Sequence, residues 1–110
     1  MKALSIVCLG FVIVSFTVAQ GIQPKEGFVP NQETAIKIAE AVLIPIYGKD
    51  RLESERPFTA ELKENKWTVY GTLRCSDGKG GSTTVGCRGG VATVEISKLD
   101  ARVLSVSHGR

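Results

Sequence analysis

Histidine and cysteine are scarce in this sequence, and their scarcity argues against several kinds of catalytic and metal-binding site. The only histidine, His108, lies near the end of the sequence, where chains often fray. A Ser-His-Asp or Cys-His catalytic arrangement therefore has no obvious internal base. Zinc sites usually take three or four ligands from His, Cys and carboxylates, which three cysteines and one histidine supply poorly. We expect no catalytic residue, no metal site and no bound cofactor.

The sequence also lacks blocks of like charge. Its 14 Lys and Arg residues and 11 Asp and Glu residues give a net charge of only +3, and they are interleaved along the chain. Nucleic acids and anionic membrane surfaces attract clustered cations. We therefore expect no nucleic-acid partner and no binding to a charged membrane surface.

The one long apolar run stands at the N-terminus. It follows Lys2 and ends in the small residues Thr17 and Ala19, the pattern of a secretory signal peptide over residues 1–19. This pattern predicts cleavage before Gln20 and export across the inner membrane, into the periplasm. An uncleaved membrane anchor is the alternative, but the run is slightly shorter than the roughly 20 residues of a span. Since Cys8 lies inside the run, a lipoprotein anchor is not expected, and nor is stable membrane insertion after cleavage.

Cleavage leaves roughly 90 residues, enough for one domain with a modest core. Residues 20–29 contain glycine and proline without apolar periodicity, which predicts a mobile lead-in. A single domain is expected over residues 30–110.

A helix is predicted over residues 32–47. Asn31 is a suitable N-cap, and Glu33 lies in the first turn, where the helix dipole favours an anion. Pro45 should kink or end the helix in its last turn, and Gly48 should stop it. The charged stretch 49–57 has room for one short helical turn, but we expect it mainly to connect the helix to the first strand. Apolar residues recur at helical spacing, at Ala35, Ile38, Ala39, Val42, Leu43 and Ile46.

Four strands are predicted after the helix. Alternating residues over 58–63 and 67–72, with a turn at Asn65-Lys66, indicate a β-hairpin. A third strand is expected over 90–96 and a last one over 103–106. Hairpin connections favour an antiparallel sheet with one face covered by the helix. The fold class is therefore α+β, with one main N-terminal helix packed on a curved four-stranded antiparallel sheet.

Cys75 and Cys87 remain after cleavage, and an even count in an exported chain usually forms a disulfide. The bridge would close a loop of about a dozen residues, worth roughly 3 kcal/mol in the chain-entropy model. Free thiols, or half of a metal site, are the alternative.

Two patterns could be taken for catalytic or phosphate sites. The glycines between Ser76 and Gly86 could cradle a phosphate, but such loops normally lead into a helix and this one leads into a strand. A flexible hairpin tip is the simpler interpretation. Glu53 and Glu55 could act as acid and base, but they alternate with arginines, which favours a solvated charged face.

Trp67 and Tyr70 should point to opposite faces of the sheet, since side chains alternate along a strand. Trp67 shares its parity with Val69, so we assign it to the face covered by the helix. Tyr70 then lies on the open face, where it is either an ordinary exposed aromatic residue or an anchor for a partner. We take Tyr70 as a candidate partner-binding residue.

Several segments of the sequence together resemble bacterial immunity proteins with a nuclear-transport-factor-two-like fold. The resemblance extends over nearly the whole chain after the signal peptide. It is carried by residues 35–48, the run Glu-Ser-Glu-Arg-Pro-Phe at 53–58, and segments 67–73, 89–98 and 103–109.

This resemblance implies a cystatin-like roll over residues 30–110, and a protein that binds and neutralises a bacterial toxin. It assigns no contact residues. The last two predicted strands also resemble PepSY-type domains, which would imply a protease-inhibiting or regulatory module. A small pocket enzyme of the wider fold is the third possibility, because one fold hosts many functions.

Overall fold

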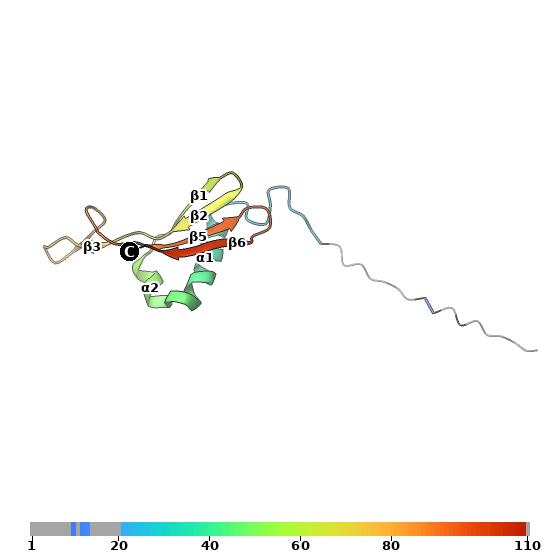
Figure 1. Ribbon diagram of the computed structural model, residues 1–110, viewed down its shortest axis with the longest axis horizontal. Helices are drawn as coiled ribbons and strands as arrows, with labels where there is room; N and C mark the ends of the chain where they lie inside the picture. Colours follow the sequence, from blue (N-terminus) through green and yellow to red (C-terminus); the bar gives the residue numbers. More distant parts are fainter. Residues whose placement is uncertain (1–9, 11, 14–20, 110) are drawn as a thin grey trace, which may run out of the picture.

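A long helix lies across one face of a four-stranded antiparallel sheet in the computed structural model, which describes residues 10, 12–13 and 21–109 (Figure 1). The predicted signal peptide and its cleavage site lie almost entirely outside these residues. No helix within them is long and apolar enough to cross a membrane. The elements are α1 (Gln32–Tyr47), α2 (Lys49–Ser54), β1 (Thr59–Lys63), β2 (Lys66–Tyr70), β3 (Cys75–Ser76), β4 (Ser82–Thr83), β5 (Ala92–Ser97) and β6 (Val103–His108).

The main helix has the bounds that the sequence predicts. The Asn31 side chain caps it by accepting a hydrogen bond from the Thr34 amide at 2.9 Å. At the other end the Gly48 amide donates to the Ile44 carbonyl at 2.8 Å, and Gly48 has a φ of 90°, which suits glycine. Pro45 lies in the last turn, and α1 ends two residues after it.

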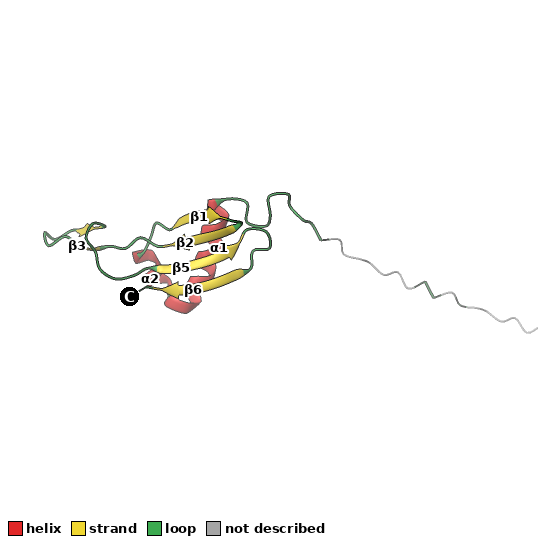
Figure 2. Ribbon diagram, turned by 45° about the horizontal axis from the view of Figure 1, so that its top comes forward, coloured by secondary structure: helices red, strands yellow, loops and turns green. Residues whose placement is uncertain are grey.

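The main sheet has the strand order β1-β2-β5-β6, with every neighbouring pair antiparallel. Both helices lie on the same face of this sheet, and the other face is open (Figure 2). Trp67 and Val69 point to the covered face, as predicted, and are buried. The predicted α+β architecture is confirmed. The core consists of Val29, Ala35, Ala39, Leu43, Leu52, Phe58, Ala60, Trp67, Val69, Ala92, Val94 and Ile96.

The first hairpin turns one residue earlier than predicted. Lys63 pairs with Lys66, so Glu64 and Asn65 form the two-residue loop, with φ of 50° and 59°. Two positive φ values give a turn whose twist matches that of the strands. Asn65 tolerates this conformation well, whereas Glu64 adopts it because the strand register requires it.

The packed part of the domain begins before the predicted boundary at Pro30. The amides of Phe28 and Val29 donate to the carbonyls of Leu99 and Lys98, at 3.2 and 3.0 Å. Val29 is fully buried, and its carbonyl accepts a 2.8 Å hydrogen bond from the Trp67 indole. The end of the predicted lead-in is therefore part of the core, which local periodicity could not reveal because only its last residues are buried.

Removing the segment before Pro30 tests this correction. A variant that begins at Pro30 should be about 3 kcal/mol less stable than one that begins at Pro24. It loses the burial of Val29 and leaves the Trp67 indole N–H without its acceptor. Urea unfolding, followed by Trp67 fluorescence, measures the difference. Equal midpoints for the two variants would contradict the assignment of Val29 to the core.

Candidate functional site

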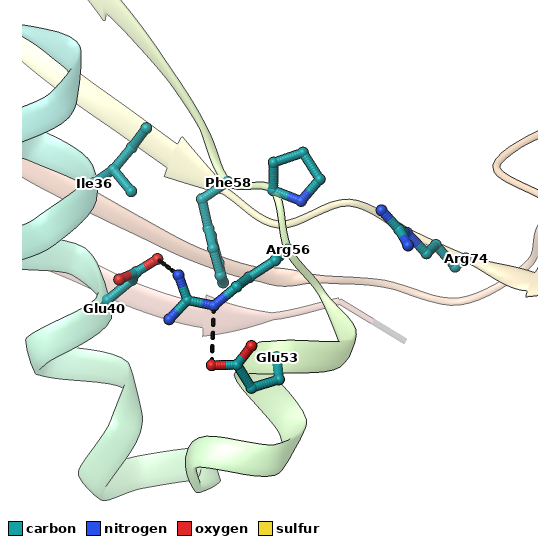
Figure 3. Close-up of a pocket in the computed structure, with 7 residues that line it drawn as sticks. Ile36, Glu40, Glu53, Arg56, Phe58 and Arg74 are labelled. Carbon is teal, nitrogen blue, oxygen red and sulfur yellow. Dashed lines mark hydrogen bonds and ion pairs between the residues drawn. The ribbon is translucent and has the colours of Figure 1, made fainter.

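The connection from α2 to β1 borders an open pocket of about 620 Å³ beside α1 (Figure 3). Arg56 lies between two carboxylates here: its Nη1 is 2.7 Å from Glu40 of α1, and its Nε is 3.3 Å from Glu53 of α2. Because Arg56 is partly exposed, each ion pair contributes little by itself, but together they link the two helices. The pocket is lined by Ile36, Glu40, Glu53, Arg56, Pro57, Phe58 and Arg74.

Glu55 is buried, which corrects its assignment to a solvated face. Its side chain is only 8% exposed, whereas that of Glu53 is 52% exposed. The Glu55 carboxylate accepts a 2.7 Å hydrogen bond from the Ala92 amide, and its backbone carbonyl accepts another from the Thr72 amide at 2.7 Å. A Cβ at Gly71 would lie 2.8 Å from the Cβ of Glu55, so this approach requires glycine. Glu55 therefore joins the end of α2 to the sheet.

The second carboxylate oxygen of Glu55 accepts no hydrogen bond from the described residues. It lies 3.6 Å from His108 Nε2 and 3.8 Å from Arg51 Nε. His108 belongs to β6 and is mostly buried, with its ring centroid 5.3 Å from that of Tyr47, so the predicted frayed end is wrong for this residue. This cluster brings α1, α2, β5 and β6 together.

A second pocket of about 300 Å³ lies beside this cluster. Two hydroxyl groups in it are held by backbone carbonyls: Ser54 donates to Arg51, and Thr72 donates to Pro57, both at 2.6 Å. These hydroxyls therefore fix the local backbone. The pocket is lined by Arg51, Ser54, Glu55, Thr72, Leu73, Arg74 and Gly90.

The open face of the sheet is polar and carries Tyr70, as predicted. The Tyr70 hydroxyl donates to Glu61 at 2.8 Å, across the β1–β2 pair. This hydrogen bond to a carboxylate is the main reason why the pKa of Tyr70 is raised above its usual value. On the same face Lys66 and Glu95 form an ion pair at 3.3 Å. The face thus presents one aromatic ring among charged and hydroxyl groups.

The segment from Cys75 to Cys87, which we call the insert, projects from one end of the sheet (Figures 1 and 2). The two cysteines form the predicted disulfide, with their Cα atoms 5.5 Å apart. Strands β3 and β4 pair with each other in a separate two-stranded sheet. The insert is exposed along most of its length, and Val85 is 81% exposed.

The glycine-rich part of the insert is organised by Asp77. Its carboxylate accepts hydrogen bonds from the amides of Lys79 and Gly81, at 2.7 and 3.0 Å. The same two hydrogen bonds lower the pKa of Asp77, because they favour its charged form. Amides that already bind a carboxylate are not available to a phosphate, and the glycines lie in the hairpin formed by β3 and β4.

Sequence reasoning identified the cysteine pair and the face of Tyr70, but it assigned Glu55 to a solvated face and gave no role to Arg56 or Arg74. The alternation of charges over residues 53–58 gives no sign that Glu55 is buried while Glu53 is exposed. That difference arises from contacts with Ala92 and His108, which are distant in the sequence.

The long helix packed on an open antiparallel sheet, with pockets at its margin, agrees with an NTF2-like α+β fold. The chain belongs to the Imm-NTF2-2 family of NTF2 fold immunity proteins, whose family model matches residues 34–110. Over 92 residues it is 29% identical to the uncharacterized protein YhhH of Escherichia coli strain K12. This alignment covers 84% of the chain and 65% of that relative's length. No solved structure matches the chain.

Replacing Glu55 tests its structural role. Glu55→Ala should lower the free energy of unfolding by about 1–3 kcal/mol, because the buried Ala92 amide loses its acceptor. Glu55→Gln should cost less, since the amide oxygen can still accept this hydrogen bond. Urea unfolding of both variants, and of Glu53→Gln as an exposed control, gives the three free energies of unfolding. Equal stability of Glu55→Ala and Glu53→Gln would contradict the role.

Removing the disulfide should loosen the insert more than the domain. In a Cys75→Ser, Cys87→Ser double variant, we expect amides 76–86 to lose protection from hydrogen exchange. The free energy of unfolding should fall by less than the roughly 3 kcal/mol that the chain-entropy model assigns to the bridge. The reason is that β3 and β4 contact only each other among the described elements, so the freed insert gains entropy in the native state too. A loss of protection throughout the main sheet would contradict this expectation.

Proposed function

We propose that this chain is an exported immunity protein that neutralises a bacterial toxin by binding it directly, and that it performs no catalysis itself. The observation that carries the proposal is the family match, which extends over residues 34–110 and so includes nearly the whole packed domain. Toxin binding by a preformed surface would block the toxin sterically and electrostatically.

Two features of the structure support direct binding through the open face and the insert. The insert projects from the sheet and is closed at its base by a disulfide, so a partner that binds it orders few residues. The open face next to it offers Tyr70, a large side chain with few rotatable bonds. Loops and exposed faces on a rigid scaffold can vary without disturbing the core, which suits recognition of one particular toxin.

Two further features favour a periplasmic location. Residues 1–19 have the pattern of a signal peptide, and the disulfide suits an oxidising compartment. The toxin would then be met outside the cytoplasm.

Rescue of poisoned cells tests this function. The toxin encoded beside this chain's gene is delivered to the periplasm of a sensitive strain that also expresses the chain. We expect survival with the full chain and death when residues 2–19 are deleted, because the protein then stays in the cytoplasm. Rescue only by the deleted form would overturn export, and failure of both forms with every neighbouring toxin would overturn the immunity function.

Replacing Tyr70 tests the open face. Tyr70→Ala should raise the Kd for the toxin about tenfold or more, the usual effect of removing an aromatic anchor. Tyr70→Phe keeps the ring and should raise the Kd much less. Calorimetric titration of the purified toxin gives the three Kd values. If Tyr70→Ala binds as well as the wild type, Tyr70 is an ordinary exposed residue.

A further inference from the structure

Arg74 lines the first pocket (Figure 3) and also the second, and it stands directly before the insert. Within residues 21–109 its guanidinium makes no ion pair and no hydrogen bond. Arg56, in the first pocket, differs because Glu40 and Glu53 both neutralise it. Arg74 is therefore a cation whose hydrogen-bond donors are available to a partner.

A second cation borders the same space. Arg51 lines the second pocket together with Arg74, and its side chain is 58% exposed. Its contacts are long: Nε lies 3.8 Å from Glu55, and Nη2 lies 3.4 Å from His108. Most of its donors therefore remain free.

The rest of the second pocket leaves room for a small charged group. The pocket holds about 300 Å³, and Gly90 lines it without a side chain. The one carboxylate in the pocket, Glu55, uses an oxygen to bind the Ala92 amide and is mostly buried. Two arginines thus face a single buried negative charge, which leaves the pocket with an excess positive charge.

We propose that a carboxylate side chain of the toxin, an aspartate or a glutamate, binds between Arg51 and Arg74. The planar guanidinium can hold a carboxylate through two parallel hydrogen bonds, which makes arginine well suited to this contact. The proposal rests on the proposed function, since it names the chemistry by which the toxin is recognised.

The first pocket indicates which kind of toxin residue should lie next to this carboxylate. Arg74 borders both pockets, so a segment bound to it reaches Ile36, Pro57 and Phe58 on the other side. These side chains are apolar, whereas the charges beside them already pair with one another. The toxin segment should therefore carry an apolar residue next to its acidic residue.

Two capped dipeptides, acetyl-Leu-Asp-amide and acetyl-Leu-Asn-amide, test the site without the toxin. They are titrated into the ¹⁵N-labelled protein while the amide signals of Thr72, Leu73 and Gly90 are followed. The aspartate peptide should give saturable shifts that the asparagine peptide does not. These shifts should disappear in Arg74→Gln and persist in Arg102→Gln, which changes an arginine at the opposite end of the sheet. Equal responses to the two peptides, or shifts that survive Arg74→Gln, would overturn the site.

The toxin itself provides the second test. Arg74→Gln should raise its Kd about tenfold and Arg74→Glu about 100-fold, because the reversed charge repels the carboxylate. Arg102→Glu should change the Kd less than twofold. Melting temperatures near that of the wild type would show that Arg74, which is exposed, does not affect folding.

The two tests separate this inference from the proposed function. If the wild type neutralises the toxin and Arg74→Glu binds it equally well, the function stands and the carboxylate site is wrong. If the dipeptide shifts appear as expected but the wild type neutralises no toxin, the carboxylate site stands and the immunity function is wrong.

Discussion

The buried carboxylate of Glu55 is the contact on which the arrangement of helices and sheet depends. It accepts a hydrogen bond from the first residue of β5, and the backbone of the same residue binds Thr72 just after β2. A charge without such partners would be costly at this depth. The end of α2 is thereby fixed against the ends of the two central strands, β2 and β5, and Glu55 lines the second pocket.

The junction gives most of a short run of charged residues a structural role. Within residues 53–58, Glu55 binds the sheet, Arg56 links the two helices, and Phe58 enters the core. The run therefore serves the architecture and needs no catalytic explanation. The proposed recognition would instead use neighbouring exposed groups, above all Arg74 and the ring of Tyr70. This separation lets the contact surface change while the scaffold stays intact.

The insert is likewise separate from the contacts that hold the domain together. Its strands pair only with each other, its turn is organised by Asp77, and a disulfide closes its base. Because it contributes little to the core, its sequence can vary at small cost to the stability of the domain. The disulfide closes the base of the insert and restricts the conformations open to it.

The sequence determined the features that depend on neighbouring residues. The helix over 32–47 followed from its cap and apolar spacing, and the faces of Trp67 and Tyr70 followed from alternation along a strand. The disulfide followed from the pairing of two cysteines in a chain with a signal-like segment. The helix and the two faces are set by residues close together in the sequence, whereas the disulfide was inferred from the signal-like segment and the count of two remaining cysteines.

Only the tertiary structure decided which charged residues are buried and which remain free. Glu53 and Glu55 look alike in the sequence, and so do Arg56 and Arg74. Their different roles arise from Glu40, Ala92 and His108, which the fold brings near from distant positions. Val29 was missed for the same reason, since its partners are Trp67 and the turn at Lys98. Burial and pairing are properties of contacts, and local periodicity does not encode the contacts between distant segments.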